Sequence, residues 1–354
     1  MAEQKVVISK DLKADLQAFL AALNYDKLFI LTDTNTQEKC YPLIQDVPAI
    51  KEAPVIIVDA GDTHKGLEAL SNIWMRLSNE GASRNSLLVN LGGGMVTDMG
   101  GFAGATFKRG LKTVNIPTTL MASVDAAVGG KTGINFNGLK NEIGSFYPPE
   151  CVFIDCEFLR TLDRDNLLSG YAEMIKHALI SSMDTYATVM LFDLDQKMDY
   201  AFLNKMVAQS VAVKERIVAE DPKEHGIRKA LNFGHTIGHA YESLSFKKNR
   251  PLLHGHAVAA GIVSELYLSH KLCGFPSSNL SQVIQYIKEY YPAFVFDCKE
   301  YETLYELMTH DKKNEGGIIN FTLLSKIGEV QINQAVTKEK ILESLDFYRE
   351  SFGV

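Results

Sequence analysis

The chain has 354 residues, more than one small core accommodates, so its length suggests two domains. With 46% apolar and 22% charged residues it can bury a normal interior, which excludes extensive disorder. A formal charge of -7, with no block of lysine and arginine to offset it, argues against nucleic acid as a partner.

No apolar run is long enough to span a bilayer, and the first residues carry no signal-peptide pattern. We therefore expect a cytoplasmic protein with no membrane partner. Five scattered cysteines without a C-x-x-C pair indicate free thiols and exclude a disulfide framework or zinc knuckle.

The first 150 residues or so alternate short apolar runs with segments of helical character, which predicts a parallel sheet covered on both faces. The candidate strands are residues 6–8, 28–32, 55–58, 87–91, 114–116 and 152–154. Beyond residue 155 strand-like runs disappear and no proline occurs between Pro149 and Pro222, which predicts helices. The exception is a late hairpin, residues 318–324 and 327–332, with a turn near Ser325.

The predicted fold is therefore an α/β N-terminal nucleotide-binding domain with a mainly parallel sheet, followed by a mainly α-helical C-terminal domain. From the change of texture we place the first domain at residues 1–157 and the second at residues 158–354.

Seven of the 26 glycines fall between Gly92 and Gly110. The first three directly follow a predicted strand and precede a helix expected to begin near Val96, where unpaired backbone N–H groups can face a phosphate. The pattern indicates a nucleotide-binding turn, and the alternative is a packing turn between strand and helix. Asp33 and Asn35, after another predicted strand, are placed either to bind a ribose or simply to form a turn.

Groups that bind metals or move protons gather in the second half. Glu173 has Lys176 and His177 three and four residues later, on one helical face. Four of the nine histidines lie between His235 and His256. One carboxylate and two imidazoles form a typical catalytic site for a divalent metal. Spacing favours His235 with His239 and leaves His254 open; the alternative for each histidine is a solvated or capped side chain.

Several cations stand in apolar or glycine-rich contexts that suit a bound phosphate or carboxylate, although a solvated surface charge is the alternative for each. They are Arg109, Lys131, Lys140, Lys176, Lys214, Arg228 and Lys312.

Together these segments resemble the 3-dehydroquinate synthase family over most of the chain, from about Asp33 to Gly328. The most specific block is residues 116–133, IPTTLMASVDAAVGGKTG. Residues 140–141, 146–148, 172–176, 231–239 and 311–313 extend the match in order.

The resemblance implies an NAD- and metal-dependent carbon–oxygen lyase, with Zn²⁺ or Co²⁺ and a homodimer. Its substrate would be an anionic sugar phosphate, 3-deoxy-D-arabino-heptulosonate 7-phosphate, converted to 3-dehydroquinate and phosphate in the shikimate pathway. Transient oxidation, phosphate elimination, re-reduction, ring opening and an intramolecular aldol closure make up that reaction.

The resemblance also implies a role for individual residues. The metal ligands are Glu173, His235 and His254. NAD-binding positions are Asp33, Asn35, Asp62, Lys65, Gly92, Gly93, Gly94, Asp98, Thr118 and Thr119. Catalytic positions are Lys131, Glu173, Lys176, Lys214 and His239. Substrate-binding positions are Arg109, Asp125, Lys140, Asn141, Arg228, Asn232 and Lys312, with Arg109 reaching across the dimer interface.

Three positions depart from the family pattern. His256 stands where glutamate is usual, two residues after the third ligand, and this change could alter the support of the metal. Asp62 replaces a glutamate, and His177-Ala178 replaces a pair that usually contains glycine.

Three other functions compete with this interpretation. A metal-dependent alcohol or glycerol dehydrogenase would release NADH. Another sugar phosphate cyclase would act on a substrate without a carboxylate, and Arg228 with Asn232 argues against it. A catalytically silent nucleotide-binding regulator would turn nothing over.

Overall fold

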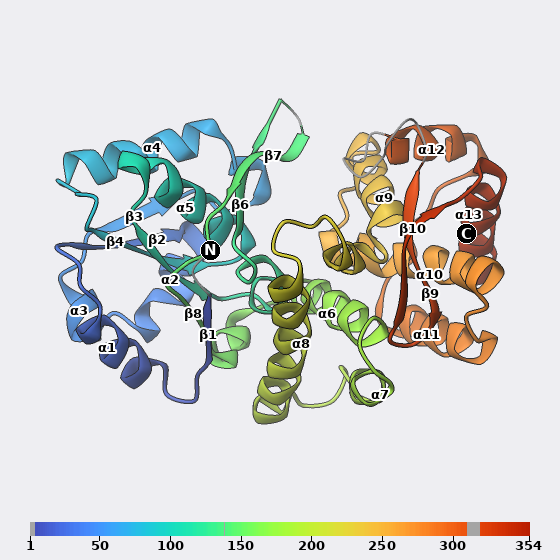
Figure 1. Cartoon of the computed structure of the whole chain (residues 1–354), viewed down its shortest axis with the longest axis horizontal. Coiled ribbons are helices and arrows are strands. Elements are labelled where there is room, and N and C mark those ends of the chain that lie inside the picture. The colour runs from blue at the N-terminus through green and yellow to red at the C-terminus, as the bar shows by residue number, and fades with distance from the viewer. Residues whose placement is uncertain (1–3, 138, 310–318) are drawn as a thin grey trace. The chain divides into compact units, whose positions relative to one another are not determined.

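The computed structural model describes residues 4–137, 139–309 and 319–354. It divides into two compact units (Figure 1). The first comprises Met1–Asp163 with Tyr200–Val211, and the second Arg164–Asp199 with Ala212–Val354. Helix α8 (Tyr200–Glu220) begins in the first unit and ends in the second. The domain boundary after residue 157 stays a prediction.

The first unit is built on a six-stranded sheet with the order β1-β8-β5-β4-β2-β3, in which all paired strands are parallel. Its strands are β1 (Lys5–Ile8), β2 (Leu28–Asp33), β3 (Val55–Val58), β4 (Leu87–Gly92), β5 (Lys112–Pro117) and β8 (Cys151–Ile154). Its helices include α1 (Leu12–Ala22), α2 (Thr34–Lys39), α3 (Pro48–Lys51), α4 (Leu67–Asn79) and α5 (Gly94–Thr106). All six predicted strands are confirmed.

Successive residues of a strand point to opposite faces of the sheet and pack in two separate hydrophobic cores. Leu28 and Ile30 pack with α1 and α3 on one face of the sheet, whereas Phe29 and Leu31 pack with α4 and α5 on the other. Figure 1 shows the two pairs of helices on opposite sides of the strands. Because both faces are buried, most positions of a central strand are apolar, and this explains the continuous runs seen in the sequence.

An antiparallel hairpin of β6 (Lys131–Phe136) and β7 (Leu139–Phe146) was not predicted. Most of β7 is exposed, so no buried apolar pattern marks it. The signal that could have found it is the pair Asn137-Gly138 between the strands, a typical hairpin turn sequence. Residue 138 lies outside the described residues.

The second unit is mainly helical, as predicted. Its elements are α6 (Arg164–Leu179), α7 (Met183–Met190), α9 (His235–Lys247), α10 (His254–Cys273), α11 (Ser277–Tyr290), α12 (Tyr301–Thr309), α13 (Lys338–Phe352), β9 (Asn320–Lys326) and β10 (Glu329–Ala335). Helix α10 packs against α6, α9, α11, α13 and β9. It is buried along most of its length, because a helix that is apolar all round needs neighbours on every side.

The late hairpin is confirmed as β9 and β10, paired antiparallel with a turn at Ile327-Gly328, slightly later than expected. The predicted first position, Ile318, lies outside the described residues. All five cysteines are free thiols, as predicted. Within the described ranges, no helix combines the length and apolarity that crossing a membrane requires.

Gly100, in the middle of α5, serves packing against the sheet. A Cβ at Gly100 would lie 2.0 Å from Asn90 Oδ1 and 2.7 Å from Leu31 Cδ2, both on strands of the sheet. We expect Gly100→Ala to destabilise the fold by about 1–3 kcal/mol and lower the melting temperature by several degrees, because the buried sheet cannot move aside. Thermal unfolding monitored by circular dichroism measures this. Gly66→Ala is the control, since nothing lies within 4 Å of its Cβ position, and equal melting temperatures for the two variants would contradict the packing role.

Candidate active site

The glycine-rich turn lies at the carboxyl end of the parallel sheet. After β2 the chain first adds β3 on one side and later returns to place β4 on the other side of β2. Ligands of open parallel sheets bind at such a reversal, outside the carboxyl ends of the strands. Asp33 ends β2 and Gly92 ends β4, so the structure places two of the predicted NAD positions at this point.

The turn after β4 packs closely against its own chain. Gly93 is the N-cap of α5, and Thr118 N–H donates to the carbonyl of Gly92 at 3.0 Å. A Cβ at Gly93 would lie 3.1 Å from Thr119 Cγ2, and one at Gly94 would lie 3.1 Å from Ala126 Cβ. A helix N-terminus with glycine at its cap and first position attracts phosphate groups. The helix N-terminus therefore suits a pyrophosphate, while the Cβ contacts show that these glycines also serve close packing, the alternative considered for them.

Asp33 caps the N-terminus of α2. Its carboxylate accepts a hydrogen bond from the N–H of Thr36 at 2.8 Å and completes a capping box at the start of α2. Asn35 is exposed in the first turn of that helix. These positions thus begin a helix and do not form an isolated turn, and their role toward a ribose stays a prediction. Thr118 Oγ1 is buried and makes no hydrogen bond to the described residues.

The unpredicted hairpin of β6 and β7 carries a polar network that the sequence did not reveal. Lys65 is buried, and its Nζ lies 2.6 Å from Asp98 Oδ2 on α5 and donates to Asn141 Oδ1 on β7. Lys140 Nζ lies 3.1 Å from Asp62 Oδ2. The hairpin therefore brings two predicted substrate positions, Lys140 and Asn141, into contact with predicted NAD positions.

The other predicted substrate and catalytic positions of the first unit lie on β6 and in the turns after β5 and α5. Lys131 is exposed at the start of β6, and Asp125 lies in a short π-helical turn, Ala122–Ala126. Arg109 is exposed after α5, and both it (φ 66°) and Lys108 (φ 47°) adopt left-handed backbone conformations. Two such residues in succession are strained, so the surrounding structure must hold this turn in place.

In the second unit, Glu173 is the buried centre of the predicted metal site. It lies in α6 with no exposed side-chain surface. Its Oε2 is paired with Lys176 one turn later, while its Oε1 lies 3.4 Å from His235 Nε2 and 3.6 Å from His254 Nε2. The ion pair with Lys176 and the two imidazoles are thus the polar neighbours of this buried carboxylate. One oxygen thus faces a lysine and the other faces two imidazoles.

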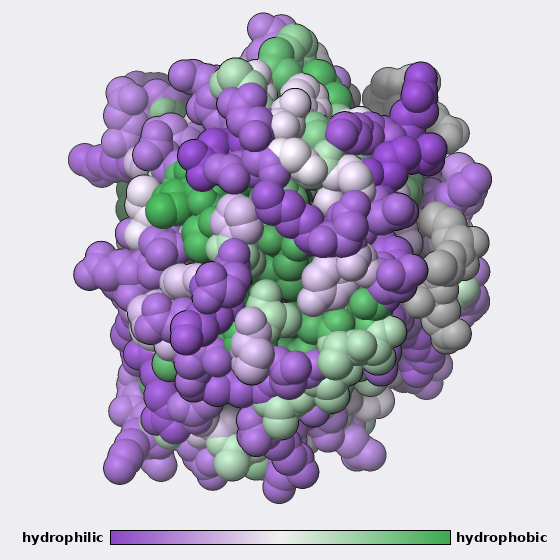
Figure 2. All heavy atoms as spheres, turned by 90° about the vertical axis from the view of Figure 1, so that its left-hand side faces the viewer, coloured by the Kyte–Doolittle hydropathy of each residue, from purple (hydrophilic) through white to green (hydrophobic). Residues whose placement is uncertain are grey.

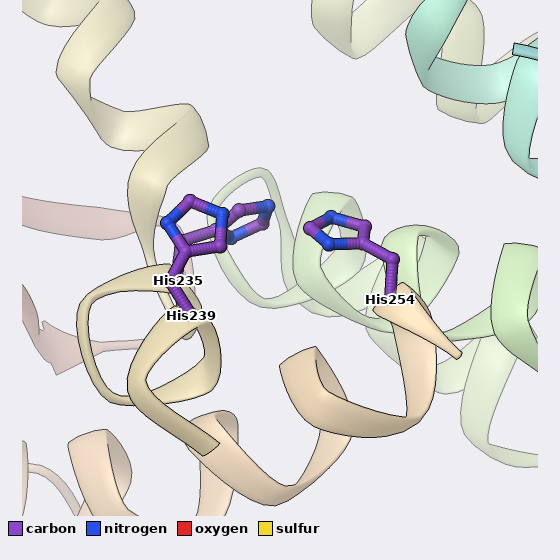
Figure 3. A group of neighbouring side chains, drawn as sticks. All are labelled: His235, His239 and His254. Atoms are coloured by element: carbon purple, nitrogen blue, oxygen red, sulfur yellow. The ribbon is translucent and has the colours of Figure 1, made fainter. Parts of the chain in front are cut away.

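The three histidines converge as Figure 3 shows, with His235 and His239 from α9 and His254 from the first turn of α10. Their candidate ligand nitrogens all lie within 4.8 Å of one another. His235 is buried, His239 is exposed and His254 is intermediate. The structure therefore brings together both pairs that the sequence left open, and it adds contacts with Glu173 for His235 and His254.

Tight helix packing positions His254. A Cβ at Gly255 would lie 1.8 Å from the carbonyl oxygen of Ser169, and the Gly255 N–H donates to Ser169 Oγ at 3.0 Å. Because Ser169 precedes Glu173 by one turn of α6, this close approach brings the start of α10 to the carboxylate. Only glycine allows it.

Each imidazole has a second partner that orients its ring. His235 Nδ1 hydrogen-bonds the carbonyl of Phe233 at 3.0 Å, so its Nε2 points to Glu173. His254 Nδ1 lies 3.2 Å from Glu242 Oε2. Such outer contacts fix the ring and the nitrogen that binds a metal. Glu242 was not predicted, although its place seven residues after His235 puts it on the same face of α9.

The charges of the cluster shift its pKa values in opposite directions. Burial and the charge of Lys176 lower the pKa of His235 to about 4, against the attraction of Glu173. For His254, burial acts to lower the pKa, but the charges of Glu242 and Glu173 outweigh it and raise the pKa to about 10. Burial acts to raise the pKa of Glu173, whereas Lys176 and His235 hold it well below its usual range. Glu173 is therefore an ionised buried carboxylate.

The position where the sequence departs from the family does not join this cluster. The ring of His256 packs edge-on against Tyr291, with 5.5 Å between centroids, and burial lowers its pKa. The contact that supports His254 comes from Glu242. Of the other two departures, His177 is fully buried in α6 and Asp62 lies beside Lys140.

The other predicted cations of this unit are buried as well. Lys176, Lys214 and Arg228 are all less than 7% exposed. Arg228 Nη1 donates to the carbonyl of Pro222 at 2.6 Å, and Asn232 Nδ2 donates to Glu224 Oε1 at 2.9 Å. Lys176 is paired with Glu173, as a buried cation must be stabilised by an anion or by polar groups. Lys312 lies outside the described residues.

The donor set fits a divalent ion. Ligand atoms bound at about 2.0–2.1 Å around a tetrahedral ion lie about 3.4 Å apart. The distances from Glu173 Oε1 to His235 Nε2 and His254 Nε2, 3.4 Å and 3.6 Å, are close to that value. Glu173 Oε2 is already paired with Lys176, so Oε1 is the carboxylate oxygen that faces the two imidazoles and remains available to an ion. One carboxylate with two imidazoles leaves a coordination position for a substrate.

The fold places the chain in a known class. A 2-epi-5-epi-valiolone synthase from Streptomyces hygroscopicus, solved with NAD⁺ and Zn²⁺ bound, matches with a TM-score of 0.88, 24% identity, and 99% and 98% coverage of the two chains. An iron-containing alcohol dehydrogenase matches with a TM-score of 0.66 and 16% identity, over 99% of this chain and 98% of the other. The chain thus has the fold shared by sugar phosphate cyclases and iron-containing dehydrogenases.

Sequence comparison identifies the family. The models for the N-terminal and C-terminal parts of 3-dehydroquinate synthase match residues 55–169 and 170–314. A 3-dehydroquinate synthase from Parabacteroides distasonis is 79% identical over the full length of both chains. One from Pyrococcus abyssi is 38% identical over 94% of this chain and 96% of its own. The chain belongs to the 3-dehydroquinate synthase family, and the resemblance drawn from its motifs is confirmed.

Proposed function

We propose that the chain converts 3-deoxy-D-arabino-heptulosonate 7-phosphate to 3-dehydroquinate and inorganic phosphate, a step of the shikimate pathway. The observation that carries the proposal is the gathering of Glu173, His235 and His254 in a chain that is 79% identical to a 3-dehydroquinate synthase over its full length. The net reaction leaves the oxidation state unchanged, because one hydroxyl is oxidised and later restored.

The proposed cofactors are NAD and one Zn²⁺ or Co²⁺ ion. When bound, NAD accepts and returns a hydride, and the metal polarises the hydroxyl that is oxidised. Glu173, His235 and His254 are the proposed metal ligands. The proposed NAD positions are Asp33, Asn35, Asp62, Lys65, Gly92, Gly93, Gly94, Asp98, Thr118 and Thr119. The glycine turn at the N-terminus of α5 supports the placement of the pyrophosphate.

The chain's own residues hold and orient an anionic substrate. The proposed phosphate and carboxylate contacts are Lys131, Asn141, Arg228 and Lys312; Arg109, Asp125, Lys140 and Asn232 are further substrate positions. Fixing both anionic ends of a flexible sugar selects one conformer, which supports ring closure by removing rotational entropy. The burial of Arg228 strengthens its attraction for a carboxylate, because water does not compete there.

Proton movement is assigned to the polar groups of the second unit. His239 presents an exposed imidazole 5.2 Å, between ring centroids, from the proposed ligand His235. Lys176 is paired with Glu173, and Lys214 is buried in α8. With Lys131 and Glu173, they are the proposed catalytic residues.

A direct assay tests the function. The purified protein with NAD and Zn²⁺ or Co²⁺ is incubated with 3-deoxy-D-arabino-heptulosonate 7-phosphate, and released phosphate and 3-dehydroquinate are quantified. We expect equal amounts of the two products, no net change at the nicotinamide absorbance band, loss of turnover with a chelator and recovery on adding metal. Net NADH formation would indicate a dehydrogenase instead, and absence of turnover would indicate a nucleotide-binding regulator.

The proposed assembly is a homodimer. Figure 2 shows an apolar area within a mostly hydrophilic face, and Ile57 on the edge strand β3 is 51% exposed. Apolar areas rimmed by polar residues are typical of protein interfaces. The exposed, strained turn of Arg109 is compatible with its role across that interface. Cytoplasmic location, and the absence of nucleic-acid and membrane partners, stay predictions.

A further inference from the structure

A buried glutamate outside the proposed ligand set contacts the turn that carries His235. Glu265 lies in α10 and has no exposed surface. Its Oε2 accepts a hydrogen bond from the N–H of Gly234 at 2.6 Å, and its Oε1 accepts one from the N–H of Ile237 at 3.0 Å. Glu265 therefore holds the backbone on both sides of His235 and Thr236, which lie between Gly234 and Ile237.

The start of α9 needs such a partner. The first four N–H groups of a helix have no acceptor within the helix. The N-cap residue here is Gly234, which has no side chain to accept them. Gly234 also adopts a left-handed conformation (φ 78°), so the backbone reverses sharply just before His235. The Glu265 carboxylate, from α10, accepts the hydrogen bonds that the side chain of an N-cap residue would otherwise accept.

The same contact joins α9 to the helix that carries the other imidazole. His254 begins α10, and Glu265 follows it eleven residues later, just over three turns along the same helix. In return, Glu242 of α9 reaches His254 Nδ1. Each helix thus provides a carboxylate that holds the histidine segment of the other.

We propose that Glu265 is a positioning residue, which fixes the backbone of His235 so that its Nε2 faces the metal site. The inference rests on the proposed metal ligands. Loss of one carboxylate oxygen would leave the N–H of Gly234 or Ile237 without an acceptor in a buried place, and the turn would rearrange to satisfy it. His235 would move with that turn.

The test compares Glu265→Gln and Glu265→Asp with Ser264→Ala in the full-length protein. Glutamine keeps the shape but turns an N–H₂ group toward a backbone N–H, and aspartate keeps the charge but is shorter. Ser264→Ala is the matched control, because it removes another buried contact between α9 and α10, the 2.9 Å hydrogen bond with Tyr241, which does not touch the turn of His235. Far-UV circular dichroism checks folding.

The readouts are Zn²⁺ affinity, by competition with a chromophoric chelator, and the visible d–d absorption of the Co²⁺ form. We expect both Glu265 variants to bind Zn²⁺ at least about tenfold more weakly and to alter the Co²⁺ spectrum. Ser264→Ala should lower the melting temperature but keep Zn²⁺ affinity within about twofold of the native protein, since it disturbs no group around the proposed ligands.

Native affinity and spectrum in whichever Glu265 variant folds would overturn the positioning role. Glu173→Gln, measured alongside, separates this failure from failure of the proposed function. If Glu173→Gln loses Zn²⁺ while the Glu265 variants keep it, only the role of Glu265 is wrong. If Glu173→Gln also keeps native affinity, the metal site itself is wrong, and the inference falls with it.

Discussion

Glu173→Gln and His254→Ala are each expected to lose the metal ion and activity together. Glu173 Oε1 faces both His235 and His254, so each variant removes one of three donors that meet at one place. Loss of the metal's charge stabilisation costs several kcal/mol in the transition state, which corresponds to about 10³-fold or more in kcat. Metal content by atomic emission and phosphate release measure the two effects.

The two variants differ in what else they disturb. Glu173→Gln also leaves the buried Lys176 without its counter-charge, which costs about 3–5 kcal/mol in comparable cases. We therefore expect it to lower the melting temperature, whereas His254→Ala keeps that ion pair. His270→Ala is the control, because its Nδ1 contacts the carbonyl of Phe275 elsewhere on α10. Normal turnover with full metal occupancy in either ligand variant would refute the assignment.

Arg228→Met is expected to lower kcat/KM for the seven-carbon substrate by roughly 10²- to 10³-fold. Arg228 is 2% exposed, and its Nη1 donates a hydrogen bond to the carbonyl oxygen of Pro222 at 2.6 Å. Its positive charge is therefore shielded from water. A buried charge pair that loses one partner costs about 3–5 kcal/mol. Arg228→Lys, which keeps the charge but not the planar fork, should fall between the native protein and Arg228→Met.

Lys229→Met is the matched control for Arg228. It removes the adjacent cation, whose Nζ donates instead to Asn333 Oδ1 on β10 at 2.9 Å. We expect it to retain kcat/KM within a few fold. Steady-state kinetics with phosphate detection measures kcat/KM for both variants. Equal effects of the two methionine variants, or a change below about fivefold for Arg228→Met, would remove Arg228 from the proposed substrate contacts.

The elements that were predictable are those in which burial repeats regularly along the chain. Strands β2 and β4 are buried at every position, so their apolar runs were visible in the sequence. Strand β7 is exposed along most of its length and escaped notice, yet it carries Lys140 and Asn141 to their contacts with Asp62 and Lys65. Exposure removes the apolar pattern on which strand prediction depends.

The metal site shows a second limit. A spacing of four residues favoured His235 with His239, because a helix presents both on one face. It carried no information on His254, whose approach to Glu173 depends on the contact of Gly255 with Ser169, two residues 86 positions apart. Contacts between segments far apart in the chain produce no repeating pattern in the sequence. The supporting glutamates, Glu242 and Glu265, were missed for the same reason.

By itself, the sequence determined the family, the class of fold and the types of donor available, because motifs and apolar periodicity are local properties of the chain. Tertiary structure decided which donors meet. Glu173 from α6, His235 from α9 and His254 from α10 converge because tightly packed helices bring their backbones together at glycine and serine. That convergence depends on side-chain volume at contacts between helices, which no spacing within one segment records.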